Sequence, residues 1–382
     1  MHQRTWLAIL TLPLVTTFTY PMVFRQAPTP NKASAANTSQ DPLAGLSDVQ
    51  DVLKQIQDYY VDVPDMEKVI AGGVEEALER AHPLNAYLPP EELKLPDPGP
   101  AQVGLMLVKK SIWAQVVGVV AGSPAAKAGI QVGDVIRKMD GESVGSLSAW
   151  ALERRLKGAP GSELNLVNYD NANGQLKKLS LKREVIRRPS ISVRKDGKGS
   201  LVEVPDFTAG RVSELKAVLA GLDHGLPLVL DLRNCTGGDL SEAALAAGLF
   251  AREGTLVTVQ EAGKSDRAIT VGKAEPAAFA RVAILQGLGT VGAAEGFSAY
   301  LKKQSIPLVG ERTAGLGVER SRFPLKQGGA LELVNRRWLG AGGEKLDRQG
   351  VLPDEPLKGL QPGEDPLSKV IEILDARLKK AS

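Results

Sequence analysis

The feature that most constrains the fold is a change of hydrophobic pattern near residue 188. Beyond this point, short apolar runs such as PLVLDLRN (227–234) alternate with helical runs such as VSELKAVLAGL (212–222) and LSEAALAAGLFA (240–251). Strands that alternate with helices are typical of a mostly parallel sheet with crossover helices. The sequence therefore predicts an α/β fold for residues 188–382, closed by a last helix over 366–381.

Two other patterns precede this α/β region. LSDVQDVLKQIQDYY and MEKVIAGGVEEALERA place apolar residues three and four apart, which predicts an N-terminal helical segment over residues 37–98. This segment ends in HPLNAYLPPEELKLPDPGPAQ, a Pro-rich stretch that we expect to be extended and to mark a boundary. From 99 to 187, short alternating strands surround one helix at 148–156, which predicts a small inserted β-rich domain.

The first 36 residues have the order of a secretory signal. Arg4 precedes an apolar stretch from Trp6 to Phe24, and a polar segment with the small-x-small site Ala33-Ser34-Ala35 follows. We favour a cleaved signal peptide over a membrane anchor because of that site, and both remain open. Either one predicts an extracytoplasmic protein, in the periplasm or cell envelope, that meets a membrane only through this segment.

Composition excludes several classes of function. The net charge is only +3, with 47 Lys and Arg against 44 Asp and Glu, so no basic surface for nucleic acid is indicated. Cys235 is the single cysteine and there are three histidines, which argues against a disulfide framework and against a metal site. We expect no cofactor, and we expect Cys235 to be packed and unreactive.

The inserted domain resembles a PDZ domain. The resemblance rests on VGLML, on the run GSPAAKAGIQVGDVIRKMDGESV and on the helix at 148–156. It implies that the loop and strand edge at Gly104, Leu105, Met106 and Leu107 hold the C-terminal tail of a peptide by strand addition, with the helix as the other wall. A PDZ-shaped spacer with an empty groove is the alternative.

The whole chain after the signal segment resembles the carboxy-terminal processing (tail-specific) proteases. LVLDLRNCTGGDLSEAALAAGLF, PLVGERTAGLGV and GVLPDEPL follow the PDZ-like domain in that family's order. The resemblance implies a serine peptidase with a Ser/Lys dyad, whose PDZ domain engages the tails of substrates. It also implies that Gly237 and Gly238 offer backbone N–H groups to an oxyanion hole.

The two segments that should carry the dyad have lost its residues. The family's nucleophile segment resembles SASASE, whereas residues 290–295 read TVGAAE and place Gly292 at the nucleophile. In GERTAGLGVER, Leu316 takes the place of the lysine base, and Arg320 replaces a supporting glutamine. The sequence therefore predicts a catalytically degenerate member, a pseudoprotease that binds peptide tails or a partner protein such as an active paralogue.

Two alternatives remain open from the sequence. The first is an active endopeptidase with a relocated nucleophile, for which Thr290 is a remote candidate and Ser298 with Lys302 the better one. Ser298 and Lys302 are four apart on a predicted helix, so they share a face, and we expect an exposed helix pair. The second alternative is a structural envelope protein that uses the fold only for contacts between subunits.

Overall fold

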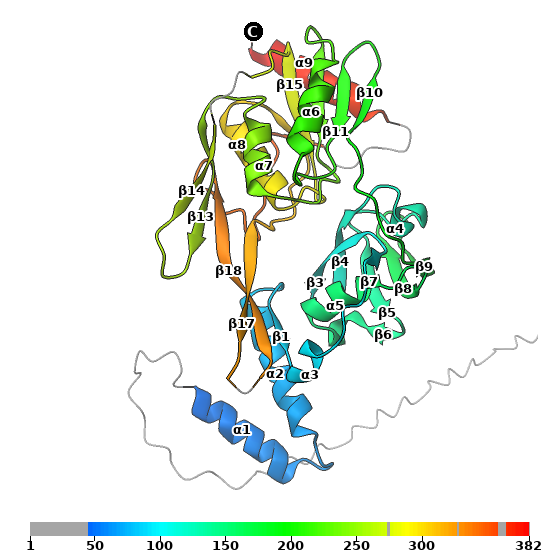
Figure 1. Cartoon of the computed structure of the whole chain (residues 1–382), viewed down its shortest axis with the longest axis vertical. Coiled ribbons are helices and arrows are strands. Elements are labelled where there is room, and N and C mark those ends of the chain that lie inside the picture. The colour runs from blue at the N-terminus through cyan, green and yellow to red at the C-terminus, as the bar shows by residue number, and fades with distance from the viewer. Residues whose placement is uncertain (1–44, 273–275, 327, 358–363, 382) are drawn as a thin grey trace, which may run out of the picture. The chain divides into compact units, whose positions relative to one another are not determined.

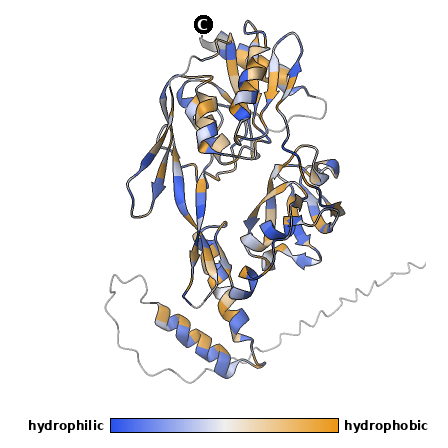
Figure 2. Cartoon of the chain, in the orientation of Figure 1, coloured by the Kyte–Doolittle hydropathy of each residue, from blue (hydrophilic) through white to orange (hydrophobic). Residues whose placement is uncertain are grey.

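The structure is a computed structural model that describes residues 45–272, 276–326, 328–357 and 364–381. The predicted signal segment at 1–36 lies outside the described residues. The chain divides into two units, residues 1–64 and 65–382 (Figure 1). In the first, α1 (Leu46–Tyr59) carries its apolar residues along one face (Figure 2). Across the described ranges, no helix combines the length and the apolar character that crossing a bilayer requires.

The second unit contains the predicted parallel sheet. Its strand order is β10-β11-β12-β15-β16-β19, and every neighbouring pair is parallel except the hairpin of β10 and β11. The strands are β10 (Ser192–Lys195), β11 (Ser200–Glu203), β12 (Pro227–Asp231), β15 (Arg281–Gln286), β16 (Leu308–Gly310) and β19 (Glu355–Pro356). The α/β prediction for this region is confirmed.

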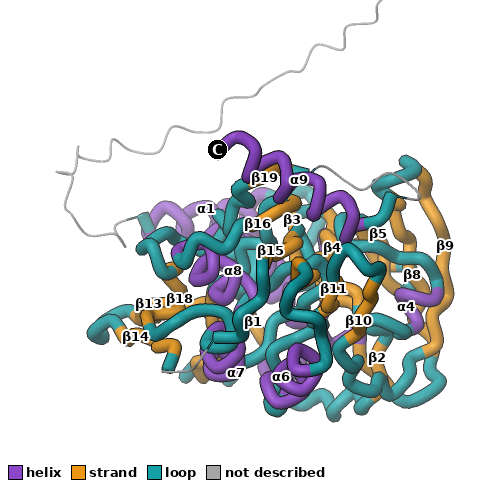
Figure 3. Tube along the Cα trace, turned by 90° about the horizontal axis from the view of Figure 1, so that it is seen from above, coloured by secondary structure: helices purple, strands orange, loops and turns teal. Residues whose placement is uncertain are grey.

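Helices cover both faces of this sheet. Leu228 and Leu230 of β12 pack toward α6 (Arg211–Ala220), α7 (Leu240–Ala247) and α8 (Ala293–Lys303). Val229 between them points the other way, toward α9 (Pro366–Ala381), because successive strand residues face opposite sides. Figure 3 shows the strands between α9 on one side and α6 and α7 on the other. This sandwich buries the apolar strands that the sequence pattern predicts.

A second, antiparallel sheet was not predicted. Its order is β1-β18-β13-β14, with β17 also paired to β18. The strands are β1 (Ala86–Leu88), β13 (Gly254–Glu261), β14 (Arg267–Val271), β17 (Val318–Pro324) and β18 (Ala330–Gly340). β1 and the short α3 (Pro90–Leu93) follow α2 (Met66–Ala81) and lie in the Pro-rich stretch that we expected to be extended and to mark a boundary. β1 is extended, and it also joins this sheet by pairing with a strand more than 240 residues later, as in Leu88↔Ala330.

Residues 99–187 form the PDZ-like domain with its own core. The strand order is β3-β4-β5-β8-β9, β6 pairs with β5, and β2 pairs with β7. The elements are β2 (Ala101–Gln102), β3 (Leu105–Lys110), β4 (Trp113–Val119), α4 (Pro124–Lys127), β5 (Val135–Met139), β6 (Glu142–Ser143), η1 (Val144–Ser146), α5 (Ala149–Leu156), β7 (Lys157–Gly158), β8 (Glu163–Asp170) and β9 (Gln175–Lys182). Ser148 begins the predicted helix as its N-cap, since its Oγ accepts the Ala151 N–H at 3.1 Å.

Candidate functional site

Gly292, at the predicted nucleophile position, lies in the turn between β15 and α8. Gly292 has φ 59° and ψ −117°, a conformation that L-residues rarely adopt and that is often held as strain at functional sites. A Cβ atom at Gly292 would lie 3.9 Å from Gly237 Cα, 3.9 Å from Leu316 O and 4.0 Å from Trp338 Cζ3. A side chain at position 292 would therefore have room, and it would point between the two other segments that the sequence assigns to the site.

Gly237 and Gly238 form the tight turn that approaches Gly292. Their φ angles are 91° and 122°, and a Cβ atom at Gly238 would collide with the backbone carbon of Phe207 at 2.4 Å. The Gly237 N–H donates to the sulfur of Cys235, whereas the Gly238 N–H has no partner in the described part of the chain. Of the two predicted N–H donors, Gly238 is thus the one left open for a carbonyl or carboxylate.

Cys235 lies beneath this turn and is fully buried. Burial raises the pKa of its thiol far above the ordinary range, because the thiolate would lose its solvation. A thiol that stays protonated is a poor nucleophile. The prediction that Cys235 is packed is confirmed, and the residue serves the turn through its contact with Gly237.

Glu295, in the first turn of α8, joins the separate segments of the site. Its buried carboxylate accepts hydrogen bonds from the N–H groups of Gly292 (3.0 Å), Gly315 (2.6 Å) and Leu316 (2.7 Å), and from Thr313 Oγ1 (2.5 Å). Burial raises its pKa to about 7, although these hydrogen bonds act in the opposite direction. No functional role for Glu295 was predicted from the sequence. The spacing of a glutamate three residues after the helix N-cap could have identified it as a clamp.

The raised pKa of Glu295 predicts a specific pH dependence of stability. The pKa of Glu295 is about 7 in the folded chain, against an ordinary value of 4.5 for a glutamate, so the folded state keeps a proton that the unfolded state releases. The free energy of unfolding should therefore fall by about 3 kcal/mol as pH rises from about 4.5 to 7, and stay level above. Urea unfolding at several pH values should show this slope, and Glu295→Gln should remove it. An unchanged slope in that variant would contradict the assignment.

Leu316, at the predicted base position, belongs to an apolar cluster. Its side chain packs with Val291 of the turn and with Val108 and Val117 from the outer face of the PDZ-like sheet. Val108 and Val117 are 4% and 2% exposed, and with Leu316 they also line a cavity of about 530 Å³. An aliphatic side chain in such surroundings can neither hold nor transfer a proton.

Comparison with known proteins places this geometry in a family. The profile of peptidase family S41 matches residues 199–357, and a PDZ domain profile matches residues 115–167. A "Probable CtpA-like serine protease" of Staphylococcus aureus (strain MSSA476) is 29% identical over 372 residues, covering 93% of this chain and 73% of that protein. Residues 199–357 form a peptidase family S41 domain, and the chain is similar to the carboxy-terminal processing proteases.

Further relatives extend the comparison. A "Probable CtpA-like serine protease" of Staphylococcus saprophyticus is 29% identical over 261 residues, which are 67% of this chain and 53% of that protein. Among solved structures, the photosystem II D1 C-terminal processing protease superposes with a TM-score of 0.66 at 21% identity, covering 81% of this chain and 92% of its own. At this identity the superposition shows a shared fold, and it confirms the predicted architecture of a protease-like α/β core with a PDZ domain.

Arg320, at the position where the carboxy-terminal processing proteases have a glutamine, connects separate parts of the structure through ion pairs and a hydrogen bond. Its guanidinium forms an ion pair with Glu153 of α5 at 2.7 Å and a longer one with Glu332 of β18 at 3.5 Å. It also donates to the backbone oxygen of Leu84 at 3.3 Å. Arg320 therefore ties the PDZ domain, β18 and the N-terminal stretch together, and each of its contacts is structural.

Ser298 and Lys302 do not form the exposed helix pair that we expected. Ser298 is fully buried, and its Oγ has no hydrogen-bond partner among the described residues. Lys302 is partly exposed, and its Nζ donates to Leu352 O at 2.7 Å and pairs with Asp354 at 3.3 Å. The expectation was wrong for Ser298 because α8 is buried on nearly every side between the sheet and its neighbours. A charged lysine held by a carboxylate is not the neutral amine that a Ser/Lys dyad needs.

The Thr290 side chain is hydrogen-bonded to backbone groups at the turn. Its Oγ1 donates to Leu232 O at 2.8 Å and accepts the Gly287 N–H at 3.1 Å, and the residue is fully buried. Both hydrogen-bonding roles of the hydroxyl are therefore used to hold the turn against the end of β12. The Thr290 hydroxyl therefore stabilises the backbone of the turn and is not placed as a nucleophile.

The predicted peptide-binding residues lie at one edge of the PDZ sheet. β3 pairs only with β4, so its other edge is available for strand addition, and α5 packs beside it. Gly104 has φ 81°, and a Cβ there would meet Ser123 Cβ at 2.3 Å, so only glycine fits this loop. The side chains of Leu105 and Leu107 belong to the domain core, while Met106 packs toward the cluster around Val117. These residues can therefore contribute backbone groups to a peptide, while their side chains are used elsewhere.

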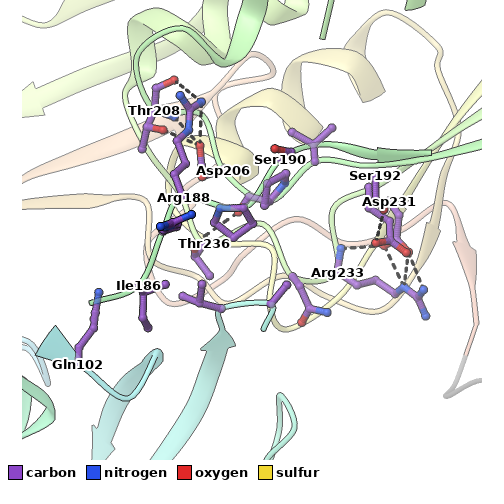
Figure 4. A pocket seen from close by; sticks show the side chains of 18 residues that line it. Gln102, Ile186, Arg188, Ser190, Ser192, Asp206, Thr208, Asp231, Arg233 and Thr236 are labelled. Carbon is purple, nitrogen blue, oxygen red and sulfur yellow. Dashed lines mark hydrogen bonds and ion pairs between the residues drawn. The ribbon is translucent and has the colours of Figure 1, made fainter. Parts of the chain in front are cut away.

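A cavity of about 440 Å³ lies beside the glycine turn (Figure 4). It adjoins the carboxyl ends of β11 and β12, where open α/β sheets commonly bind ligands. Its charged side chains are largely paired with each other, as Asp231 with Arg233 at 2.5 Å and Asp206 with Arg188 at 3.5 Å. This agrees with the interpretation of Asp231 and Arg233 as part of a strand-end turn.

Proposed function

We propose that this chain is an extracytoplasmic pseudoprotease of the carboxy-terminal processing family, which binds peptide tails or a partner protein without cleaving them. One observation carries the proposal: Gly292 keeps the strained backbone of a nucleophile turn and offers no side chain. Loss of a protease nucleophile costs about six orders of magnitude in rate. The aliphatic Leu316 at the base position supports the same conclusion.

Binding would use what the fold retains. The free edge of β3 can add a peptide strand through backbone hydrogen bonds, as in other PDZ domains. The unpartnered N–H of Gly238 can hold a carbonyl or carboxylate oxygen even without a nucleophile. The location outside the cytoplasm rests on the signal-like order of residues 1–36 in the sequence.

An active endopeptidase with a relocated nucleophile is the weaker candidate. It would require Ser298 and Lys302 to act together, but Ser298 is buried and Lys302 is bound to Asp354 and Leu352 O. Thr290 would have to leave two hydrogen bonds to react. A purely structural envelope role remains the alternative if no peptide binds.

We expect no new fragments when the full chain is incubated with an unstructured protein that ends in an apolar tail. The measurement is an intact-mass time course, with a family member that has an intact Ser/Lys dyad as the positive control. The same substrate should bind, and a C-terminally amidated tail should bind more weakly because the loop at Gly104 recognises a free carboxylate. Fragments that persist through purification and vanish in Ser298→Ala would overturn the proposal.

A stable complex between the chain and an active paralogue would assign the partner as a protease subunit. Failure to bind any tail, together with stable self-association, would favour the structural role. Size-exclusion chromatography with light scattering distinguishes these outcomes, because each predicts a different mass for the assembly.

A further inference from the structure

The outer face of the PDZ sheet carries a basic hollow far along the sheet from the edge at β3. The hollow has a volume of about 740 Å³ and crosses β5, β8 and β9. Its cations are Arg137, Lys138 and Lys178, and Val167 and Leu176 supply apolar surface between and beside them. None of the residues that line it is acidic.

These three cations differ from other basic residues of the same domain. Lys177, the neighbour of Lys178, pairs with Asp170 at 2.7 Å, and Lys127 pairs with Glu184 at 2.9 Å. By contrast, Arg137, Lys138 and Lys178 form no ion pair with any described residue. Two acidic residues border the hollow: Asp140 accepts the Asn165 N–H at 2.9 Å, and Glu163 accepts a hydrogen bond from Ser180 Oγ at 3.2 Å. The hollow therefore keeps an excess of positive charge, because its three cations form no ion pair with either carboxylate.

The strand register sets the spacing of this charge. Three successive strands place Lys138, Val167 and Lys178 opposite one another. The Cα atoms of the two lysines are therefore about 10 Å apart. Leu176 lies in the next row of the same face, about 7 Å from Lys178. An extended peptide places alternate side chains about 7 Å apart. Its acidic residues can therefore contact the row of lysines while its apolar residues contact the row of Leu176.

Two apolar groups near the cations are unusually exposed. Leu176 is 64% exposed, and Trp113 is 37% exposed with the Arg137 guanidinium 5.8 Å from its ring centre. An apolar side chain of a ligand bound beside the cations would remove this apolar surface from water. β9 is also an edge strand, since it pairs only with β8, and can therefore accept another strand.

We propose that this hollow binds an acidic, extended segment of a partner polypeptide, in which carboxylates alternate with apolar side chains. The carboxylates would pair with Arg137, Lys138 and Lys178, and the apolar residues would cover Val167 and Leu176. The site lies at the opposite edge of the sheet from β3, and it does not depend on whether the chain cleaves peptides. Because the surface is hollowed, an extended chain fits it better than a flat bilayer does.

The test is fluorescence anisotropy with the full chain and a labelled 16-residue peptide of alternating glutamate and valine. The peptide is amidated at its C-terminus, so that it cannot use the carboxylate loop at Gly104. We expect binding that weakens about tenfold when salt rises from about 50 to 200 mM, because the contacts are exposed ion pairs. The same peptide with glutamine in place of glutamate should not bind.

Charge reversal locates the site. Arg137→Glu, Lys138→Glu and Lys178→Glu together should weaken binding about 100-fold, since each replaces an attraction by a repulsion. The matched control reverses three unpaired, exposed cations of the α/β core, Lys198, Lys216 and Arg252, and should change the affinity less than about threefold. Lys178→Gln alone, which leaves the strand intact, should weaken binding about threefold.

Three results would overturn the proposal. The first is an equal loss of affinity in both triple variants, which would indicate a general charge effect. The second is the absence of any binding by the acidic peptide. The third is binding to phosphatidylglycerol vesicles, but not to the peptide, which would assign the surface to a membrane.

Discussion

Gly292→Ser combined with Leu316→Lys should convert this chain into a working peptidase. A Cβ atom at position 292 has room, with its nearest neighbours, Gly237 Cα and Leu316 O, both at 3.9 Å. The backbone strain of a serine there, about 1–3 kcal/mol, is of the kind that folded sites sustain. A lysine at 316 would lie among Val108, Val117 and Val291, and these apolar surroundings would lower its pKa and leave the amine neutral.

The expected gain is at least about 1,000-fold in the rate of fragment formation over the parent chain, a fraction of the roughly million-fold effect of a nucleophile. Intact-mass analysis of an unstructured substrate measures it. The matched control is Gly292→Ala with Leu316→Lys, which has the same strain and charge but no hydroxyl. Equal cleavage by that control would show that the new activity does not come from residue 292. A folded, inactive double variant would show that the site lacks more than its dyad.

Glu295→Ala should destabilise the chain by about 4 kcal/mol. The substitution removes the acceptor of four hydrogen bonds, from Gly292, Thr313, Gly315 and Leu316. Each buried donor left without a partner costs about 1–3 kcal/mol. The turn at Gly292 and the 313–316 segment should lose their fixed positions together, because the same carboxylate holds both.

Urea unfolding monitored by tryptophan fluorescence measures this loss. The matched control is Glu372→Ala on α9, an exposed glutamate whose ion pair with Lys369 is 3.6 Å long, and it should change stability by less than about 1 kcal/mol. A similar, small effect in both variants would mean that Glu295 is not the clamp of the site. In that case the hydrogen bonds to its carboxylate would be replaceable by water.

Local pattern was sufficient to predict the elements that carry the site. The alternation of strands and helices after residue 188 predicted the parallel sheet, and the helix predicted at 148–156 is α5. These two predictions succeeded because each depends on neighbours within one strand, helix or turn. The structure places Gly292 near Gly237 and Leu316, and the assignment of Gly292 and Leu316 to the dyad positions stays a prediction.

Other features could not be predicted because they depend on distant residues. β1 lies in a Pro-rich stretch with no strand pattern, and it exists because β18 supplies its hydrogen-bonding partner. Ser298 has the spacing of an exposed residue relative to Lys302, yet it is buried because several elements pack around α8. Periodicity identifies one apolar face of a helix, but it does not reveal how many faces are covered.

The sequence by itself determined the fold class and predicted Gly292 and Leu316 at the dyad positions, since these depend on residue identity and short-range pattern. Only the tertiary structure decided which residues surround Gly292 and Leu316. There, Val108 and Val117 of the PDZ sheet pack on Val291 and Leu316, and the buried carboxylate of Glu295 holds the turn and the 313–316 segment in place. The reason is physical: burial and hydrogen bonding join residues that are far apart along the chain, and their energies depend on surroundings that no local pattern encodes.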